Sequence, residues 1–209
     1  MYLSRIPLDM SNRKTQIALV SPNKFHGAIE DSFDEKQKRN LWRIDALQGK
    51  MYLLLLSQAK PDLKYIANQF GKKEDCGETK EYEVLLNRIR EDSIWQFRLV
   101  ANPTHSIKAE NGRGKVTAHT VEVFQLGWLN QQSVKKGFRV LPDTLKVTGA
   151  NWKIFHKKDR KQQVRLLEVA YEGKLKVEDV EVFKDTLING IGREKAYGMG
   201  LLTIAGSEG

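Results

Sequence analysis

The sequence has very little cysteine and no long apolar run, and each shortage excludes a class of protein. Among the 209 residues, Cys76 is the single cysteine, so no internal disulfide can form. It has no Cys or His neighbours with which to hold zinc. The longest apolar run, residues 51–56, is six residues long, and a membrane-spanning helix needs about 20. Because the first residues also lack a signal-peptide pattern, we expect a cytoplasmic protein with no membrane association.

Positive charge is what the chain has in excess. Lys and Arg number 35 against 26 Asp and Glu, which gives a formal net charge of +9. Hydrophobic residues make up 40% and charged residues 29%, a balance typical of a globular protein with one large domain or two smaller ones. The basic excess predicts an acidic partner, and nucleic acid is the leading candidate.

The first half of the chain predicts a split β-α-β-β-α-β order. Phe25, Ile29 and Phe33 recur every four residues and indicate a helix over residues 22–36. Around it we predict strands at residues 2–8, 40–47, 51–57, 82–89 and 95–101, and a second helix at residues 61–70. This order is that of a ferredoxin-like domain.

The second half loosely repeats this order. Residues 103–120 are polar and lack a clear period, so they predict a linker between a domain at 1–102 and a domain at 121–209. In the second domain we predict helices at residues 121–135 and 177–188, and strands at 138–141, 144–155, 164–171 and 201–205. The predicted fold class is therefore α+β, with antiparallel sheets in two tandem domains.

His26 is the only histidine inside a strong helical pattern. One residue turns a helix by about 100°, so His26 should lie at the edge of the buried face that contains Phe25 and be half exposed. An imidazole in that position suits proton transfer near neutral pH. The alternative is an ordinary surface histidine. No pair of histidines has the spacing of metal ligands, so we expect no metal and no other cofactor.

The segment of residues 153–165 contains six Lys or Arg against one Asp. Its centre falls between two predicted strands, so we expect a basic hairpin tip that could neutralise phosphates in a nucleic-acid groove. The alternative is solubilising surface. The cations at this tip are Lys157, Lys158, Arg160 and Lys161.

A second candidate is the glycine-rich segment of residues 190–200, which contains four glycines in eleven residues. Glycines such as Gly192 allow the backbone to approach a phosphate closely, and Arg193 and Lys195 add positive charge. The spacing fits neither a Walker loop nor a dinucleotide-binding loop. A tight structural connection is the alternative.

Several of these motifs together resemble the CasE family, the repeat-RNA endoribonucleases of type I-E CRISPR systems within the RAMP superfamily. The motifs are Met1-Tyr2-Leu3-Ser4, the histidine after Ser21-Pro22, the segment Phe97-Arg98-Leu99-Val100-Ala101-Asn102-Pro103, Trp128-Leu129, and the closing Gly-Ile-Gly-x-x-Lys-x-x-Gly-x-Gly-Leu-Leu. The glycine-rich loop is shared by many RAMP proteins, whereas the Ala-Asn-Pro motif and the histidine placement are specific to CasE. The resemblance spans the whole chain.

This resemblance implies two tandem ferredoxin-like (RRM-like) domains and a metal-independent cut on the 3′ side of a CRISPR repeat hairpin. It maps the catalytic histidine onto His26 and the RNA-gripping hairpin onto residues 157–161. The partners that it implies are precursor and mature CRISPR RNA and the other subunits of the Cascade complex. Well-known members have a tyrosine three residues before the histidine, where this chain has Asn23. Either Asn23 replaces it through hydrogen bonding, or another group such as Lys24 compensates.

Two rival functions remain at this point. A non-catalytic RNA-binding RAMP subunit would share the fold, the charge and the glycine-rich loop. A metal-dependent nuclease is disfavoured because the sequence shows no cluster of carboxylates for two metals.

Overall fold

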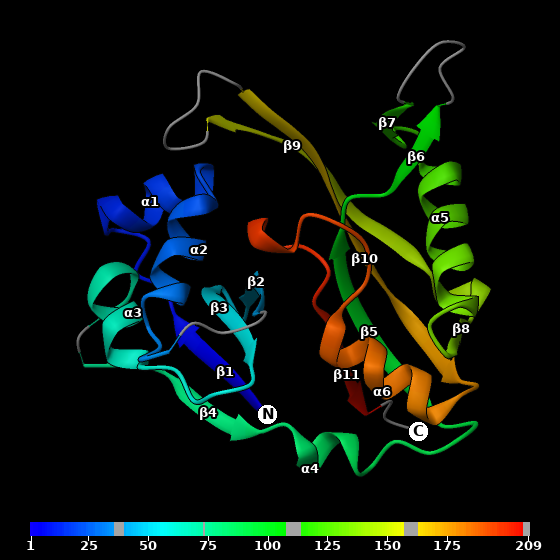
Figure 1. Cartoon of the computed structure of the whole chain (residues 1–209), viewed down its shortest axis with the longest axis horizontal. Helices are drawn as coiled ribbons and strands as arrows, with labels where there is room; N and C mark the ends of the chain where they lie inside the picture. The colour runs from blue at the N-terminus through cyan, green and yellow to red at the C-terminus, as the bar shows by residue number, and fades with distance from the viewer. Residues whose placement is uncertain (36–39, 73, 108–113, 157–162, 207–209) are drawn as a thin grey trace. The chain divides into compact units, whose positions relative to one another are not determined.

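The computed structural model describes residues 1–35, 40–72, 74–107, 114–156 and 163–206 (Figure 1). The chain divides into two compact units. Unit 1 comprises Met1–Arg88, Ile154–Val164 and Glu194–Leu201, and unit 2 comprises Ile89–Lys153, Arg165–Arg193 and Leu202–Gly209. Both units combine helices with antiparallel strands, which confirms the predicted α+β class.

Unit 1 contains a four-stranded sheet with the strand order β2-β3-β1-β4, in which every neighbouring pair is antiparallel. Its elements are β1 (Tyr2–Pro7), α1 (Arg13–Val20), α2 (Asn23–Glu30), β2 (Leu41–Leu47), β3 (Lys50–Ser57), α3 (Leu63–Phe70), β4 (Glu78–Glu81), α4 (Glu83–Leu86) and the short 3₁₀ helix η2 (Lys195–Tyr197). With the helices placed between β1 and β2 and between β3 and β4, this is the ferredoxin-like arrangement.

The core of unit 1 lies between this sheet and the helices α1, α2 and α3, which Figure 1 shows together beside the sheet. Phe25 of α2 is buried in this core and packs against two other aromatic rings. The ring centroid of Phe25 lies 4.7 Å from that of Phe70 in α3 and 5.7 Å from that of Trp42 in β2. Burying one such side chain stabilises a fold by about 1.5–3 kcal/mol. These contacts fix the rotation of α2 and therefore the direction of its remaining side chains.

Unit 2 contains the strand order β11-β5-β10-β8, with β9 paired to β10. Its elements are β5 (Ile94–Ala101), β6 (Thr104–Ile107), β7 (Lys115–Ala118), α5 (Glu122–Val134), β8 (Phe138–Val140), the 3₁₀ helix η1 (Pro142–Thr144), β9 (Lys146–His156), β10 (Gln163–Val177), α6 (Val180–Asn189) and β11 (Leu202–Gly206). The last three residues of β9 and the first two of β10 are assigned to unit 1. If β5 is taken as the first strand, this order is again ferredoxin-like. The prediction of two such folds in tandem is confirmed.

The division between the two units differs from the predicted one. Strand β5 was expected to close the first domain, but it pairs with β10 and β11 of unit 2. The units therefore divide between Arg88 and Ile89, not at residue 102. The strand predicted at residues 82–89 is wrong, because α4 lies there, and the fourth strand of unit 1 is the earlier β4.

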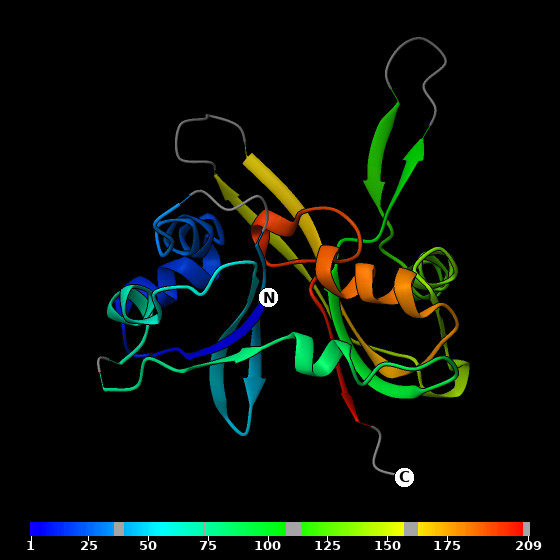
Figure 2. The same ribbon diagram turned by 60° about the horizontal axis from the view of Figure 1, so that its bottom comes forward.

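Two other segments also differ from prediction. Residues 103–120, expected to be a linker, contain β6 and β7, which pair as a hairpin that projects beyond the sheet of unit 2 (Figure 2). The helix predicted over residues 22–36 ends at Glu30, and α1 precedes it. Among the helices of the described residues, none has the length and apolar character that a membrane-spanning helix requires.

Candidate active site

Helix α2 presents His26 beside the buried face, as its sequence position predicts. Phe25, Ala28 and Ile29 are buried in unit 1, whereas 42% of the His26 side chain is exposed. The imidazole therefore borders the core and remains accessible to a substrate. Its Nδ1 atom lies 4.0 Å from Oε1 of Glu30, one helical turn further along.

The other two predicted catalytic residues have different surroundings. Asn23 is partly exposed, but its Oδ1 atom is buried and has no hydrogen-bond partner among the described residues. Lys24 is exposed to solvent. Asn23 lies three residues before His26, so both project from the same side of α2. No hydrogen bond is recorded between them in the described structure, so the direct replacement of the family tyrosine by Asn23 stays a prediction.

The glycine-rich segment is divided between the two units. Residues 194–201 belong to unit 1, where η2 contacts both α2 and β2, and this places Lys195 on an element that packs against the helix of His26. Gly192 and Arg193 belong to unit 2. Gly192 has a φ of +80°, and a Cβ added there would lie 3.3 Å from the ring of Trp128.

Two residues of β2 that the sequence analysis missed hold the unit 1 part of this loop. Gly198 has a φ of +83° and lies so close to the Trp42 ring that an added Cβ would come within 2.8 Å of it. Arg43 donates from Nη1 to the carbonyl oxygen of Leu201 at 2.8 Å. It also donates from Nε and Nη2 to the two carboxylate oxygens of Asp45, at 2.8 and 2.6 Å. The sequence did offer one signal for Arg43, because it is a charged residue between the apolar residues Trp42 and Ile44 of a strand.

The predicted RNA-gripping cations lie outside the described residues; they are Lys157, Lys158, Arg160 and Lys161. The strands that lead toward them are described. In unit 2, the Arg165 guanidinium lies over the Trp152 ring, 4.1 Å from its centroid, and Lys153 Nζ lies 3.9 Å from Glu168 Oε1. Burial raises the pKa of the Glu168 carboxyl, and the positive charges of Lys153 and Arg98 act in the opposite direction. These contacts join β9 to β10.

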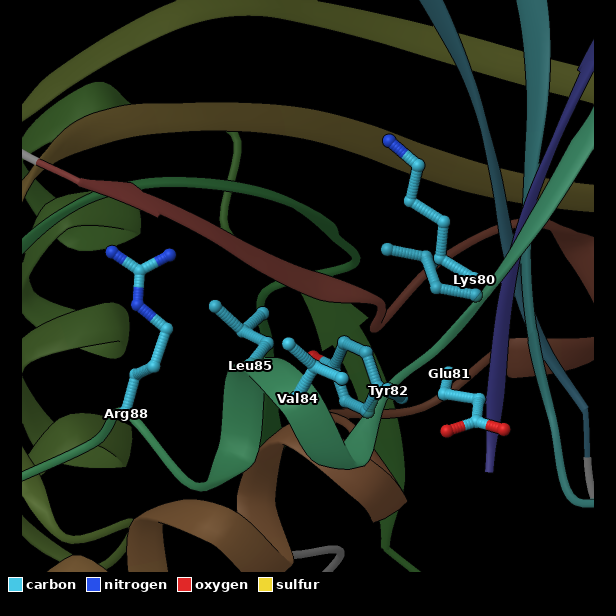
Figure 3. A pocket seen from close by; sticks show the side chains of 7 residues that line it. Lys80, Glu81, Tyr82, Val84, Leu85 and Arg88 are labelled. Atoms are coloured by element: carbon cyan, nitrogen blue, oxygen red, sulfur yellow. The ribbon is translucent and has the colours of Figure 1, made fainter.

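A pocket elsewhere in unit 1 contains none of the predicted site residues. Its volume is about 390 Å³. Figure 3 labels lining side chains of β4, of α4 and of the residues beside these elements, and Leu3 of β1 completes the lining. The lining residues are Leu3, Lys80, Glu81, Tyr82, Val84, Leu85 and Arg88. The candidate active site on α2 around His26 therefore stays a prediction that this pocket does not test. Across the described ranges, no group of three or more His, Cys, Asp or Glu side chains is placed to hold a metal ion.

Comparisons with known proteins match the chain over nearly its whole length. A family model described as CRISPR associated protein matches residues 1–206. The CRISPR-associated endoribonuclease Cse3 of Thermus thermophilus is 28% identical over 222 residues, which cover 98% of this chain and 100% of that protein.

Solved structures show the same fold. A structure of CRISPR endoribonuclease Cse3 bound to a 19-nucleotide RNA has a TM-score of 0.79 at 23% identity, over 98% of this chain and 100% of that one. A chain of a CRISPR RNA-guided surveillance complex in a pre-nicking state has a TM-score of 0.72 at 20% identity, over 99% of this chain and 100% of that one.

Proposed function

Because this chain belongs to the CRISPR-associated protein family, we propose that it is an endoribonuclease that cuts CRISPR repeat RNA without a metal ion. The observation that carries the proposal is the full-length match to the Thermus Cse3 endoribonuclease. The accessible imidazole of His26 supports it, because a group able to transfer protons is present on the surface of unit 1.

In the proposed reaction, the ribose 2′-oxygen on the 3′ side of the repeat hairpin attacks the adjacent phosphorus. The bond from phosphorus to the leaving 5′-oxygen breaks. The products are a 2′,3′-cyclic phosphate and a 5′-hydroxyl. His26 either takes the proton of the 2′-hydroxyl or gives a proton to the leaving oxygen. Lys24 and Lys195 are the cations proposed to offset the negative charge on the phosphorane. Asn23 is proposed to position one of the reacting groups.

RNA binding is proposed for the basic hairpin tip, Lys157, Lys158, Arg160 and Lys161, and for Gly192, Arg193 and Lys195 of the glycine-rich segment. Cations near phosphates release counterions and supply most of the affinity for a nucleic acid. The net charge of +9 supports such a surface. After cleavage, the protein is proposed to keep its product and to act as a Cascade subunit in the cytoplasm. A chain of a surveillance complex with the same fold supports this assignment.

Incubation with an end-labelled repeat RNA tests the proposal. We expect cleavage at one position, at the same rate with and without excess EDTA, because the attacking group is the ribose itself. The 5′ fragment should end in a 2′,3′-cyclic phosphate or a 3′-phosphate, as identified by mass spectrometry. A free 3′-hydroxyl or a loss of activity in EDTA would indicate a metal-dependent nuclease. Tight binding without any cut would favour the alternative, a non-catalytic RNA-binding subunit.

A further inference from the structure

Glu30 is the acidic group nearest to the His26 imidazole among the recorded contacts of the described residues. Its Oε1 atom lies 4.0 Å from Nδ1 of His26, and the two residues are one helical turn apart on α2. This separation is about 1 Å longer than a hydrogen bond. Hydrogen bonds at active sites are often long before substrate binds and shorten in the complex.

Asn40, just before β2, restricts the Glu30 side chain. Its Nδ2 atom donates a hydrogen bond of 3.2 Å to Glu30, and the acceptor is the same Oε1 atom that faces His26. Asn40 is only 8% exposed, and its own Oδ1 has no hydrogen-bond partner in the described structure. A buried carbonyl oxygen without a hydrogen bond destabilises a fold. Arrangements with such a cost are expected mainly at functional sites.

The contact of His26 with Glu30 contributes little to the stability of the fold. The side chains are 42% and 32% exposed, and ion pairs between residues four apart on exposed helix surfaces contribute little to stability. Its larger effect is on the imidazole itself. A carboxylate facing Nδ1 favours the tautomer with the proton on Nδ1, which leaves the lone pair on Nε2. The same carboxylate stabilises the imidazolium after Nε2 has accepted a proton.

We propose that Glu30, held by Asn40, is a positioning residue that keeps the proton of His26 on Nδ1 and presents Nε2 to the RNA. This inference rests on the proposed function, because it gives His26 the part of general base toward the 2′-hydroxyl. Glu30 itself touches no reacting atom. The acid acts through the imidazole, as the acid of a hydrolytic triad does.

The experiment compares full-length wild type with Glu30→Ala, Glu30→Gln and the control Asp31→Asn. Asp31 is the adjacent exposed acid, and its recorded contact is with the Tyr65 hydroxyl. The ring ¹⁵N signals of His26 are assigned by their absence in His26→Ala. We expect wild type and Asp31→Asn to show the Nδ1-protonated tautomer. Glu30→Ala should shift the population toward protonation on Nε2. Glu30→Gln should keep much of the wild-type tautomer, because its amide oxygen still accepts a hydrogen bond.

Cleavage kinetics supply the second measurement. Glu30→Ala should lower the single-turnover cleavage rate by about 10- to 100-fold, the range expected for losing a hydrogen bond to a charged group. RNA affinity should stay unchanged, and Glu30→Gln should restore part of the rate. If His26→Ala is inactive while Glu30→Ala keeps both the wild-type rate and tautomer, this inference fails and the proposed function stands. If His26→Ala cleaves normally, the proposed function itself fails.

Discussion

Replacing His26 by alanine should lower the rate of repeat-RNA cleavage by about 10² to 10⁴, the usual contribution of a general acid or base. The side chain is 42% exposed, so its removal leaves no cavity in the core of unit 1. Folding and affinity for the RNA hairpin should therefore stay close to wild type. Single-turnover cleavage and filter binding, measured on the same preparation, separate the two effects.

His105→Ala is the matched control for this variant. It removes an imidazole from β6 in unit 2, where the His105 ring stacks on the His119 ring with 4.4 Å between the ring centroids. Because that histidine has no assigned part in cleavage, its loss should leave the rate unchanged. A His26→Ala protein that cleaves as fast as the His105→Ala protein would remove His26 from the mechanism.

The second large effect is expected from Arg43→Ala. The Arg43 side chain is 2% exposed and donates to both carboxylate oxygens of Asp45 and to the carbonyl of Leu201. Removing one partner of a buried ion pair destabilises a protein by about 3–5 kcal/mol. Asp45 is 15% exposed, so we expect a value near the lower end, measured as the free energy of unfolding in urea.

Arg5→Ala is the control for this stability prediction. Arg5 pairs with Glu78 at 2.7 Å, but the side chains are 43% and 45% exposed. Exposed ion pairs contribute about 0–1 kcal/mol, so this variant should unfold nearly as wild type does. Equal losses of free energy in the two variants would show that Arg43 does not hold the glycine-rich loop in the way described.

The apolar patterns of the sequence predicted most of the elements, and the errors fall where no such pattern exists. Strand β4 has the sequence Glu-Thr-Lys-Glu and is mostly exposed at the edge of its sheet. It therefore has no apolar alternation that could reveal it. The next apolar residues, in α4, were taken for that strand. This shifted β5 into the first domain, since local periodicity does not show which strands will pair.

The candidate site was predictable only in its local part. The half exposure of His26 follows from its rotation relative to Phe25 on α2. In contrast, the contact of η2 with α2 joins segments far apart in the chain. Arg43 and Asn40 were missed for the same reason, because their partners are Leu201 and Glu30 in space rather than neighbours in a motif. Long-range contacts of this kind leave no periodic signal in a single sequence.

The central claim is that the RNA supplies its own nucleophile and His26 moves the proton. A repeat RNA with deoxyribose at the nucleotide whose 2′-oxygen is to attack tests this most directly, because it retains the hairpin and every phosphate. We predict that the wild-type protein binds this RNA with unchanged affinity and does not cut it. Cleavage of the deoxy-substituted RNA at the normal position would contradict the account.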